Sequence, residues 1–110
     1  MKKQYRVCKN YEFSAILKEK RFYACPSFVI YVKPRKEDHA RVGISVGKKI
    51  GNAVVRNKVK RQVRMILHEI FDFNGNFDMI LLVRIKYLDE NYNTNKNCLE
   101  KLLKKVKIDK

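Results

Sequence analysis

At 110 residues the chain is long enough for one domain with a modest core and too short for two. Its formal net charge of +15, from 26 basic against 11 acidic residues, opposes compaction by self-repulsion and indicates a polyanionic partner. No apolar stretch approaches the roughly 18 residues of a membrane span, and no apolar segment follows the basic N-terminus. We therefore expect neither a membrane protein nor a signal peptide.

The cysteines predict a reduced protein. Cys8, Cys25 and Cys98 are odd in number, widely separated and form no Cys-x-x-Cys pair. This pattern supports neither a disulfide framework nor a zinc site. We expect a cytoplasmic protein without structural disulfides.

The first part of the chain predicts a helix followed by a strand. Asn10 is a suitable N-cap, and apolar residues follow it at helical spacing. Segment 27–32 follows Pro26 and is rich in β-branched and aromatic residues, which predicts a strand. On that strand Val29 and Tyr31 share one face.

A second strand is predicted over 41–46, where apolar and non-apolar residues alternate. The alternation leaves Arg41, Gly43 and Ser45 on the outer face. If Tyr31 projects on the same side, the sheet offers a floor of small residues with one aromatic ring, on which unpaired bases could stack. The alternative is that the aromatic residue belongs to the core, as most aromatic residues in strands do.

The rest of the chain predicts a long helix, a strand and a last helix. The basic helix ends near Phe71, and the apolar run 77–83 is typical of a central strand. Segment 91–97 is a polar connection, and Leu99 begins an apolar helical repeat. The whole predicts one α+β domain over residues 1–110, a two-layer α/β sandwich with one layer of helices on a sheet.

The basic run 48–64 is the most informative feature. No acid occurs between Asp38 and Glu69. On a helical wheel the polar residues form one strip beside an apolar stripe, and the strip consists of Arg56, Asn57, Lys60, Arg61, Arg64 and His68. Solvated helix faces usually mix acids with bases, and like charges one turn apart repel, so folding alone does not explain the strip. It predicts binding to a phosphodiester backbone.

Residues for catalysis are not evident. The two histidines, His39 and His68, could in principle perform acid–base cleavage of RNA, but they fall in unrelated predicted elements. The acids lack the spacing that would hold two metal ions. We predict no catalytic residue, metal site or tightly bound cofactor in this chain.

Segment 43–64 closely resembles the signature of the bacterial ribonuclease P protein component. In that family an Arg-Asn-x-x-Lys-Arg-x-x-Arg helix follows a Lys-Lys-x-Gly-Asn-Ala loop. Here the motif is filled by Lys48, Lys49, Gly51, Asn52, Ala53, Arg56, Asn57, Lys60, Arg61 and Arg64. The Arg6-Val7-x-x-Asn10-x-x-Phe13 segment and the first strand extend the resemblance over roughly 6–106.

The resemblance implies a fold and an activity. The fold would have the order α-β-β-β-α-β-α, similar to ribosomal protein S5 domain 2, with a left-handed βαβ crossover that opposes the usual hand. The activity would be 5′ maturation of precursor transfer RNA. The catalyst would be an RNA that requires magnesium, so the partners would be that RNA and precursor transfer RNA. No membrane and no obligate protein partner would be involved.

The resemblance also implies two binding surfaces. The catalytic RNA would contact Lys48, Lys49, Asn52, Arg56, Asn57, Lys60, Arg61, Arg64 and His68. The 5′ leader of the precursor would lie in a cleft between the first helix and the sheet, against Phe13, Leu17, Val29, Tyr31, Arg41 and Ser45. The family often has a second aromatic residue where Leu17 stands.

Three other classes of protein share some of these features. A general or ribosomal RNA-binding protein would have the same charge but no preference for substrates with a leader. A self-sufficient nuclease would cleave RNA alone and would depend on His39 and His68. A helix-turn-helix DNA-binding protein is disfavoured because strands flank the basic helix.

Overall fold

The computed structural model describes residues 5–7 and 10–106. The regular elements follow in chain order: α1 (Asn10–Lys18), β1 (Phe22–Ala24), β2 (Phe28–Pro34), β3 (Val42–Ser45), the 3₁₀ turn η2 (Lys48–Ile50), α2 (Ala53–Ile70), β4 (Phe77–Val83), the 3₁₀ turn η3 (Ile85–Asp89) and α3 (Tyr92–Lys105). The α+β fold and its element order agree with the prediction. None of the described helices is long and apolar enough to cross a membrane.

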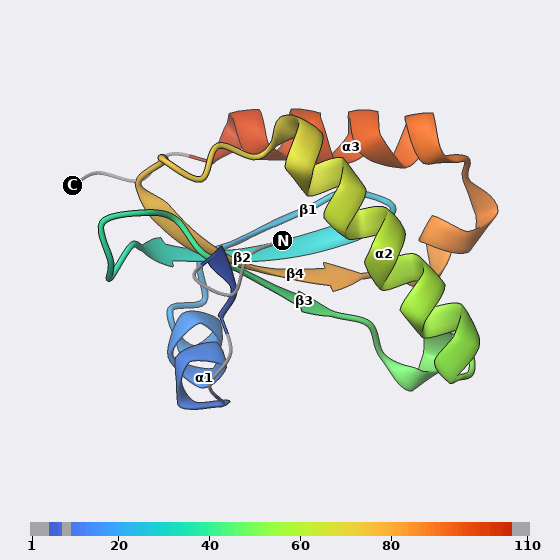
Figure 1. Cartoon of the computed structure of the whole chain (residues 1–110), viewed down its shortest axis with the longest axis horizontal. Coiled ribbons are helices and arrows are strands. Elements are labelled where there is room, and N and C mark those ends of the chain that lie inside the picture. The colour runs from blue at the N-terminus through green and yellow to red at the C-terminus, as the bar shows by residue number, and fades with distance from the viewer. Residues whose placement is uncertain (1–4, 8–9, 107–110) are drawn as a thin grey trace.

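The four strands form one sheet in the order β1-β2-β4-β3 (Figure 1). The β1–β2 and β2–β4 pairs are antiparallel, whereas β3 and β4 are parallel neighbours. Parallel strands need a long return connection, and α2 provides it. The left-handedness of this β3–α2–β4 crossover stays a prediction from the family resemblance. The topology makes β3 the last strand of the sheet on that side, where Arg6 forms an isolated parallel bridge with Val42.

The main core lies between one face of the sheet and the helices α2 and α3. The sheet contributes fully buried residues such as Phe28, Ile30 and Leu81. The helices contribute their apolar stripes, namely Val59, Val63, Ile66 and Leu67 of α2 with Leu99 and Leu102 of α3. Burial of this stripe fixes the rotation of α2, so its polar residues must face outward.

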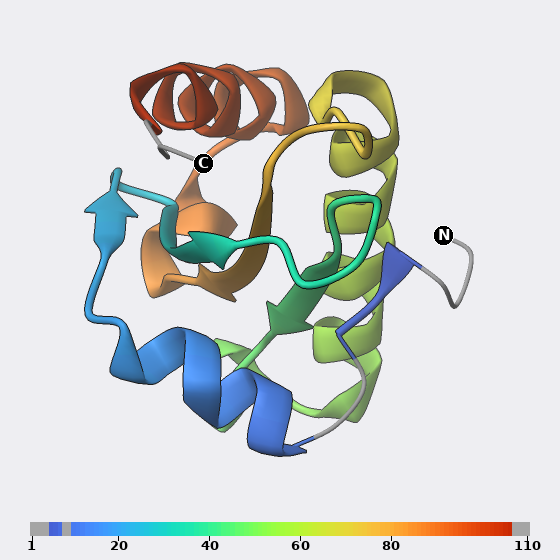
Figure 2. The ribbon, with the colours of Figure 1, turned by 90° about the vertical axis from the view of Figure 1, so that its left-hand side faces the viewer.

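The opposite face of the sheet is partly covered by α1, which differs from the two-layer expectation. Ile16 of α1 is buried against Ile80 of β4 and Val7, and this second cluster also contains Phe13, Tyr31 and Leu82. Figure 2 shows α1 on one side of the sheet and α2 with α3 on the other. The apolar outer residues of β4 explain the added layer, because a central strand that is apolar on both faces must be covered twice.

One predicted boundary was wrong. The helix α3 begins at Tyr92 rather than after 97, because Asn91 caps it by accepting a hydrogen bond from the Thr94 N–H at 2.8 Å. The third strand before α2, which the resemblance implies but residue patterns did not locate, is β1, and it pairs with only three residues of β2. Short polar helix turns and short edge strands carry weak periodic signals.

The expectation that no disulfide is present was also wrong. Cys25, just after β1, is joined to Cys98 of α3 by a disulfide bond, with their Cα atoms 6.5 Å apart. The two residues are separated by 73 positions, and only the packing of α3 against β1 brings them together. Cys8 lies outside the described residues.

Candidate RNA-binding surfaces

The loop that leads into α2 is shaped by two local interactions. The Asn52 side chain caps α2 by accepting a hydrogen bond from the Val55 N–H at 3.0 Å. Gly51 has φ 155°, and a Cβ there would lie 2.9 Å from Cβ of Val55, so glycine is required. Ile50 is buried and anchors η2, while Lys48 and Lys49 are exposed beside it. Two cations therefore stand next to the positive end of the α2 dipole.

The cationic strip comprises Arg56, Asn57, Lys60, Arg61, Arg64 and His68, all on α2. Arg56 and Lys60 are half-buried at its inner edge, and the other four members are exposed. None of the ion pairs that the described residues form involves a lysine or arginine of this strip. The Nε atom of Arg56 is buried without a hydrogen-bond partner in the described part of the chain. The strip therefore presents uncompensated positive charge along one helix face.

Acids on this side of the molecule are paired with cations of another element. Glu69, one residue beyond the strip, accepts a hydrogen bond from Lys96 of α3 at 2.6 Å and another from the Tyr92 hydroxyl at 3.4 Å. The Lys96 hydrogen bond, opposed by desolvation, lowers the pKa of Glu69. Its negative charge is directed toward α3 and does not neutralise the strip.

We call the face of the sheet that α1 partly covers the outer sheet face. The register of the strands arranges its residues in two rows. Across β1, β2, β4 and β3 the first row is Phe22, Tyr31, Ile80 and Gly43, and the second is Ala24, Val29, Leu82 and Ser45. The predicted leader residues Val29, Tyr31 and Ser45 thus share one face. All three are half-buried, so part of each side chain stays accessible.

Phe13 closes one side of this face. Its ring lies over Gly43, where an added Cβ would come within 2.6 Å of Phe13 Cζ. The absence of a side chain at 43 therefore lets α1 approach the β3 edge. Leu17, one turn later on α1, is 39% exposed. The structure brings Phe13 and Tyr31 into one cluster and leaves Leu17 at its rim.

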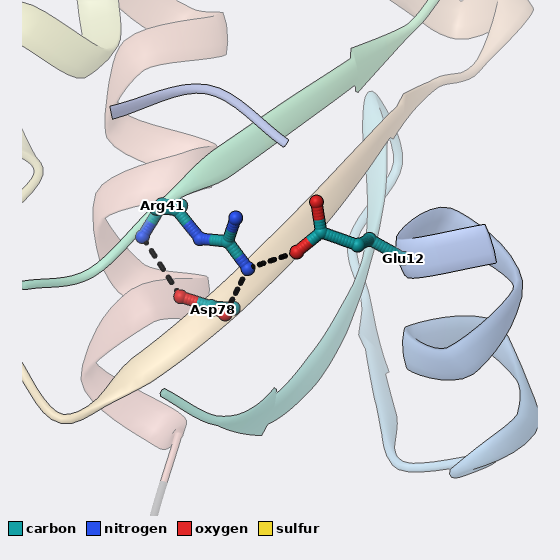
Figure 3. Close-up of polar contacts among 3 residues, drawn as sticks. All are labelled: Glu12, Arg41 and Asp78. Atoms are coloured by element: carbon teal, nitrogen blue, oxygen red, sulfur yellow. Dashed lines mark hydrogen bonds and ion pairs between the residues drawn. The ribbon is translucent and has the colours of Figure 1, made fainter. Parts of the chain in front are cut away.

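Arg41 does point to the α1 side, but its guanidinium is already engaged. Its Nη2 donates to Glu12 of α1 at 2.6 Å and to Asp78 of β4 at 3.2 Å (Figure 3). The Asp78 carboxylate also accepts the Arg41 backbone N–H at 3.0 Å. The Glu12 hydrogen bond, with a smaller contribution from Asp78, raises the pKa of Arg41 against the effect of burial. This buried ion pair fastens α1 to the sheet.

A pocket of about 250 Å³ joins the two surfaces at the β3 edge. Its walls are Phe13 and Gly43 on one side and Lys60 and Arg64 of the strip on the other. Sequence patterns treated the strip and the leader face as separate. The structure makes them adjacent, because β3 is an edge strand with α1 against one face and α2 against the other.

The histidines lie in different places. His39 is in the loop before β3, where its Nδ1 is 2.8 Å from Asp38 Oδ1, and His68 lies on the strip. The hydrogen bond to His39 lowers the pKa of Asp38. Among the described residues, no group of three or more His, Cys, Asp or Glu side chains is placed to hold a metal ion.

Sequence reasoning missed an exposed aromatic residue on the outer sheet face. Phe22 of β1 is 57% exposed, and its ring centroid lies 5.7 Å from that of Tyr31. It extends the aromatic surface of the outer sheet face by one strand. The alternation of Phe22, Tyr23 and Ala24 was the available signal, but three residues are too few to identify a strand.

An α+β fold with an uncompensated cationic helix beside an aromatic sheet face defines an RNA-binding protein. The family model Ribonuclease P matches residues 1–107 of the chain, which therefore belongs to the ribonuclease P protein family. The protein subunit of ribonuclease P is part of an RNA-based endoribonuclease that matures transfer RNA 5′ ends, and this chain has that role.

Relatives match over nearly the whole length. The ribonuclease P protein component of Mycoplasma capricolum is 47% identical over 109 residues, covering 97% of this chain and 100% of the relative. That of Streptococcus mutans is 42% identical and covers 98% of this chain and 91% of the relative.

Solved structures agree with the fold. The Staphylococcus aureus RNase P protein superposes with a TM-score of 0.79 at 40% identity, covering 91% of this chain and 93% of that one. The Thermotoga maritima RNase P protein superposes with a TM-score of 0.81 at 30% identity, covering 94% of this chain and 98% of that one. A further S. aureus structure is of an RNase P protein mutant with defective mRNA degradation activity.

Proposed function

We propose that this chain binds the catalytic RNA through α2 and the precursor leader through the outer sheet face. The observation that carries the proposal is the pocket at the β3 edge, where Phe13 and Gly43 of the leader face meet Lys60 and Arg64 of the strip. A precursor strand that leaves the RNA active site could pass this edge onto the sheet without crossing the molecule.

The RNA surface would consist of the strip together with Lys48 and Lys49. Arginine forks and lysine ammonium groups neutralise phosphates, and they release counterions when they do so. Asn52 is a different case, because its side-chain oxygen already caps α2. We assign Asn52 the task of fixing the direction of the helix and its cationic loop.

The leader surface would consist of Phe13, Val29, Tyr31 and Ser45, with Leu17 at the rim. Half-buried aromatic rings can stack with unpaired bases and tolerate any sequence. Arg41 would act indirectly, since its Nη2 is held by Glu12 and Asp78. Its task is to hold α1 in place as one wall of the leader surface.

Binding of the leader would separate substrate from product. Mature transfer RNA has no leader, so these contacts favour the precursor and release the product. The net charge of +15 would also offset phosphate repulsion between the two RNAs, and so lower the magnesium concentration that the catalytic RNA needs. We place this activity in the cytoplasm, where reductants would open the Cys25–Cys98 bond.

The test is cleavage of a precursor transfer RNA with a short leader at low magnesium, using the catalytic RNA alone, the protein alone and both together. Only the pair should cleave efficiently. Arg64→Ala should weaken assembly, whereas Tyr31→Ala should weaken precursor binding and spare assembly. Tyr31→Phe is the matched control, because it keeps the ring and should bind the precursor like the wild type. Equal precursor affinity of the wild type and Tyr31→Ala would refute the leader surface.

The protein-alone arm also tests the nuclease alternative. The S. aureus relative described above gives a reason to include an mRNA substrate in that arm. Cleavage by the protein alone that is lost in a His39→Ala/His68→Ala variant would assign catalysis to this chain. If the protein assembles with the catalytic RNA but binds precursor and mature transfer RNA equally well, a general RNA-binding protein would be favoured.

A further inference from the structure

A pocket of about 610 Å³ opens beside the C-terminal half of α2, on the side of the sheet away from the leader face. Three apolar residues form its floor: Tyr5 from the N-terminal segment, Met65 from α2 and Phe73 from the loop before β4. We call it the Met65 pocket. None of the RNA contacts proposed above uses this floor.

The floor contains two aromatic rings in contact, tilted by 46° to one another. The rings of Tyr5 and Phe73 lie with centroids 4.7 Å apart, and Phe73 in turn packs edge-on against buried Phe71 at 4.9 Å. The other edge of Tyr5 is held by the His39 ring at 5.2 Å. Met65 is 54% exposed on the same helix face as Arg61 and His68.

The rim of the Met65 pocket is cationic. Arg61, Arg64 and His68 surround Met65 on the same helix face, and all three belong to the strip. Glu69 also borders the pocket, but Lys96 and Tyr92 hold its carboxylate. An aromatic floor beside the guanidinium groups of Arg61 and Arg64 matches the chemistry of a nucleotide, with its flat base and its anionic phosphates.

We infer that the Met65 pocket takes one unpaired nucleobase of the catalytic RNA, extruded from the strand whose phosphates contact Arg61 and Arg64. Phosphate contacts bind any polyanion, so they cannot by themselves select a particular RNA. A base can leave its stack and enter a pocket only where the RNA has a loop or bulge opposite that pocket. The pocket would therefore set the register of the protein on its RNA. This inference rests on the proposed function.

A charge-adding substitution separates this idea from simple electrostatics. Met65→Lys adds a positive charge to a cationic surface, so phosphate binding alone predicts equal or tighter binding. The pocket predicts the opposite: loss of one stacked base should weaken binding by about 5- to 150-fold. Leu88→Lys is the matched control, because Leu88 is 47% exposed on η3, does not line the Met65 pocket and receives the same charge. It should not weaken binding.

A spectroscopic test identifies the base itself. Catalytic RNAs carrying 2-aminopurine at single unpaired positions within the protein footprint would be titrated with wild-type protein, and stacking on the rings should quench the fluorescence at one of them. Tyr5→Ala should abolish the quenching, and Tyr5→Phe, which keeps the ring, should retain it. Quenching at none of these positions would overturn the inference, as would a Tyr5→Phe variant that behaves like Tyr5→Ala.

Wild-type assembly with the catalytic RNA and cleavage at low magnesium are measured in the same preparations. If the wild type fails to assemble, the proposed function fails and the pocket inference fails with it. If the wild type assembles and cleaves but Met65→Lys binds as tightly, only the pocket inference is wrong. Wild-type dimerisation that Met65→Lys abolishes would make a second copy the occupant and would also overturn it.

Discussion

Replacing Arg41 by alanine should destabilise the whole fold by several kcal/mol. In Figure 3 the Arg41 guanidinium lies between the side chains of Glu12 and Asp78, which are 11% and 4% exposed. Removing it takes a shared hydrogen-bonding cation away from two largely buried carboxylates. Breaking a buried ion pair in this way costs about 3–5 kcal/mol. That is a large fraction of the roughly 5–15 kcal/mol that stabilises a typical domain.

The assay is urea unfolding followed by circular dichroism, because the chain contains no tryptophan. With a slope of about 1–3 kcal/mol per molar urea, the midpoint of Arg41→Ala should fall by about 2 M. Lys58→Ala is the control, since Lys58 is exposed on α2, and it should stay within about 0.5 kcal/mol of the wild type.

The reasoning would be refuted by a loss below about 1 kcal/mol, which is the value expected for an exposed ion pair. If the loss is as expected, precursor binding by the variant should also weaken while the catalytic RNA still assembles, because α1 carries residues of the leader surface and none of the strip.

Three other outcomes follow from particular contacts. Burial raises the pKa of Tyr87 to about 12, so the free energy of unfolding should fall by about 1.4 kcal/mol per pH unit once the pH exceeds the unfolded pKa of about 10. Urea unfolding at pH 9 and pH 11 should show a smaller difference in stability for Tyr87→Phe than for the wild type. Gly43→Ala places a Cβ 2.6 Å from the Phe13 ring and should lower the free energy of unfolding by about 1–3 kcal/mol in the same assay. Gly47→Ala, with no atom within 4 Å of the new Cβ, should lower it much less. The Cys25–Cys98 bond leaves a single thiol among three cysteines, so denatured protein should react with one equivalent of thiol reagent before reduction and three after it; three equivalents before reduction would exclude the bond.

The elements with long, regular patterns were predictable from the sequence. The strand β4 matches the apolar run 77–83, and α2 extends only three residues before Arg56, the first residue of the predicted strip. The rotation of α2 was also predictable, because its buried residues Val59 and Val63 share the apolar stripe. The spacing of apolar and polar residues sets the type and the buried face of a helix or strand within a few turns of chain, so the sequence alone determines both.

Contacts between distant parts of the chain were decided only by the tertiary structure. Arg41 was correctly placed on the α1 side, yet its partners Glu12 and Asp78 lie 29 and 37 residues away, and no periodic signal links the three. The Cys25–Cys98 bond and the pocket that joins Phe13 to Arg64 have the same origin. Each arises where separate elements pack on one sheet. The sequence therefore determined which residues could bind RNA, and the strand order β1-β2-β4-β3 decided which of them meet, because it makes β3 an edge that both α1 and α2 can reach.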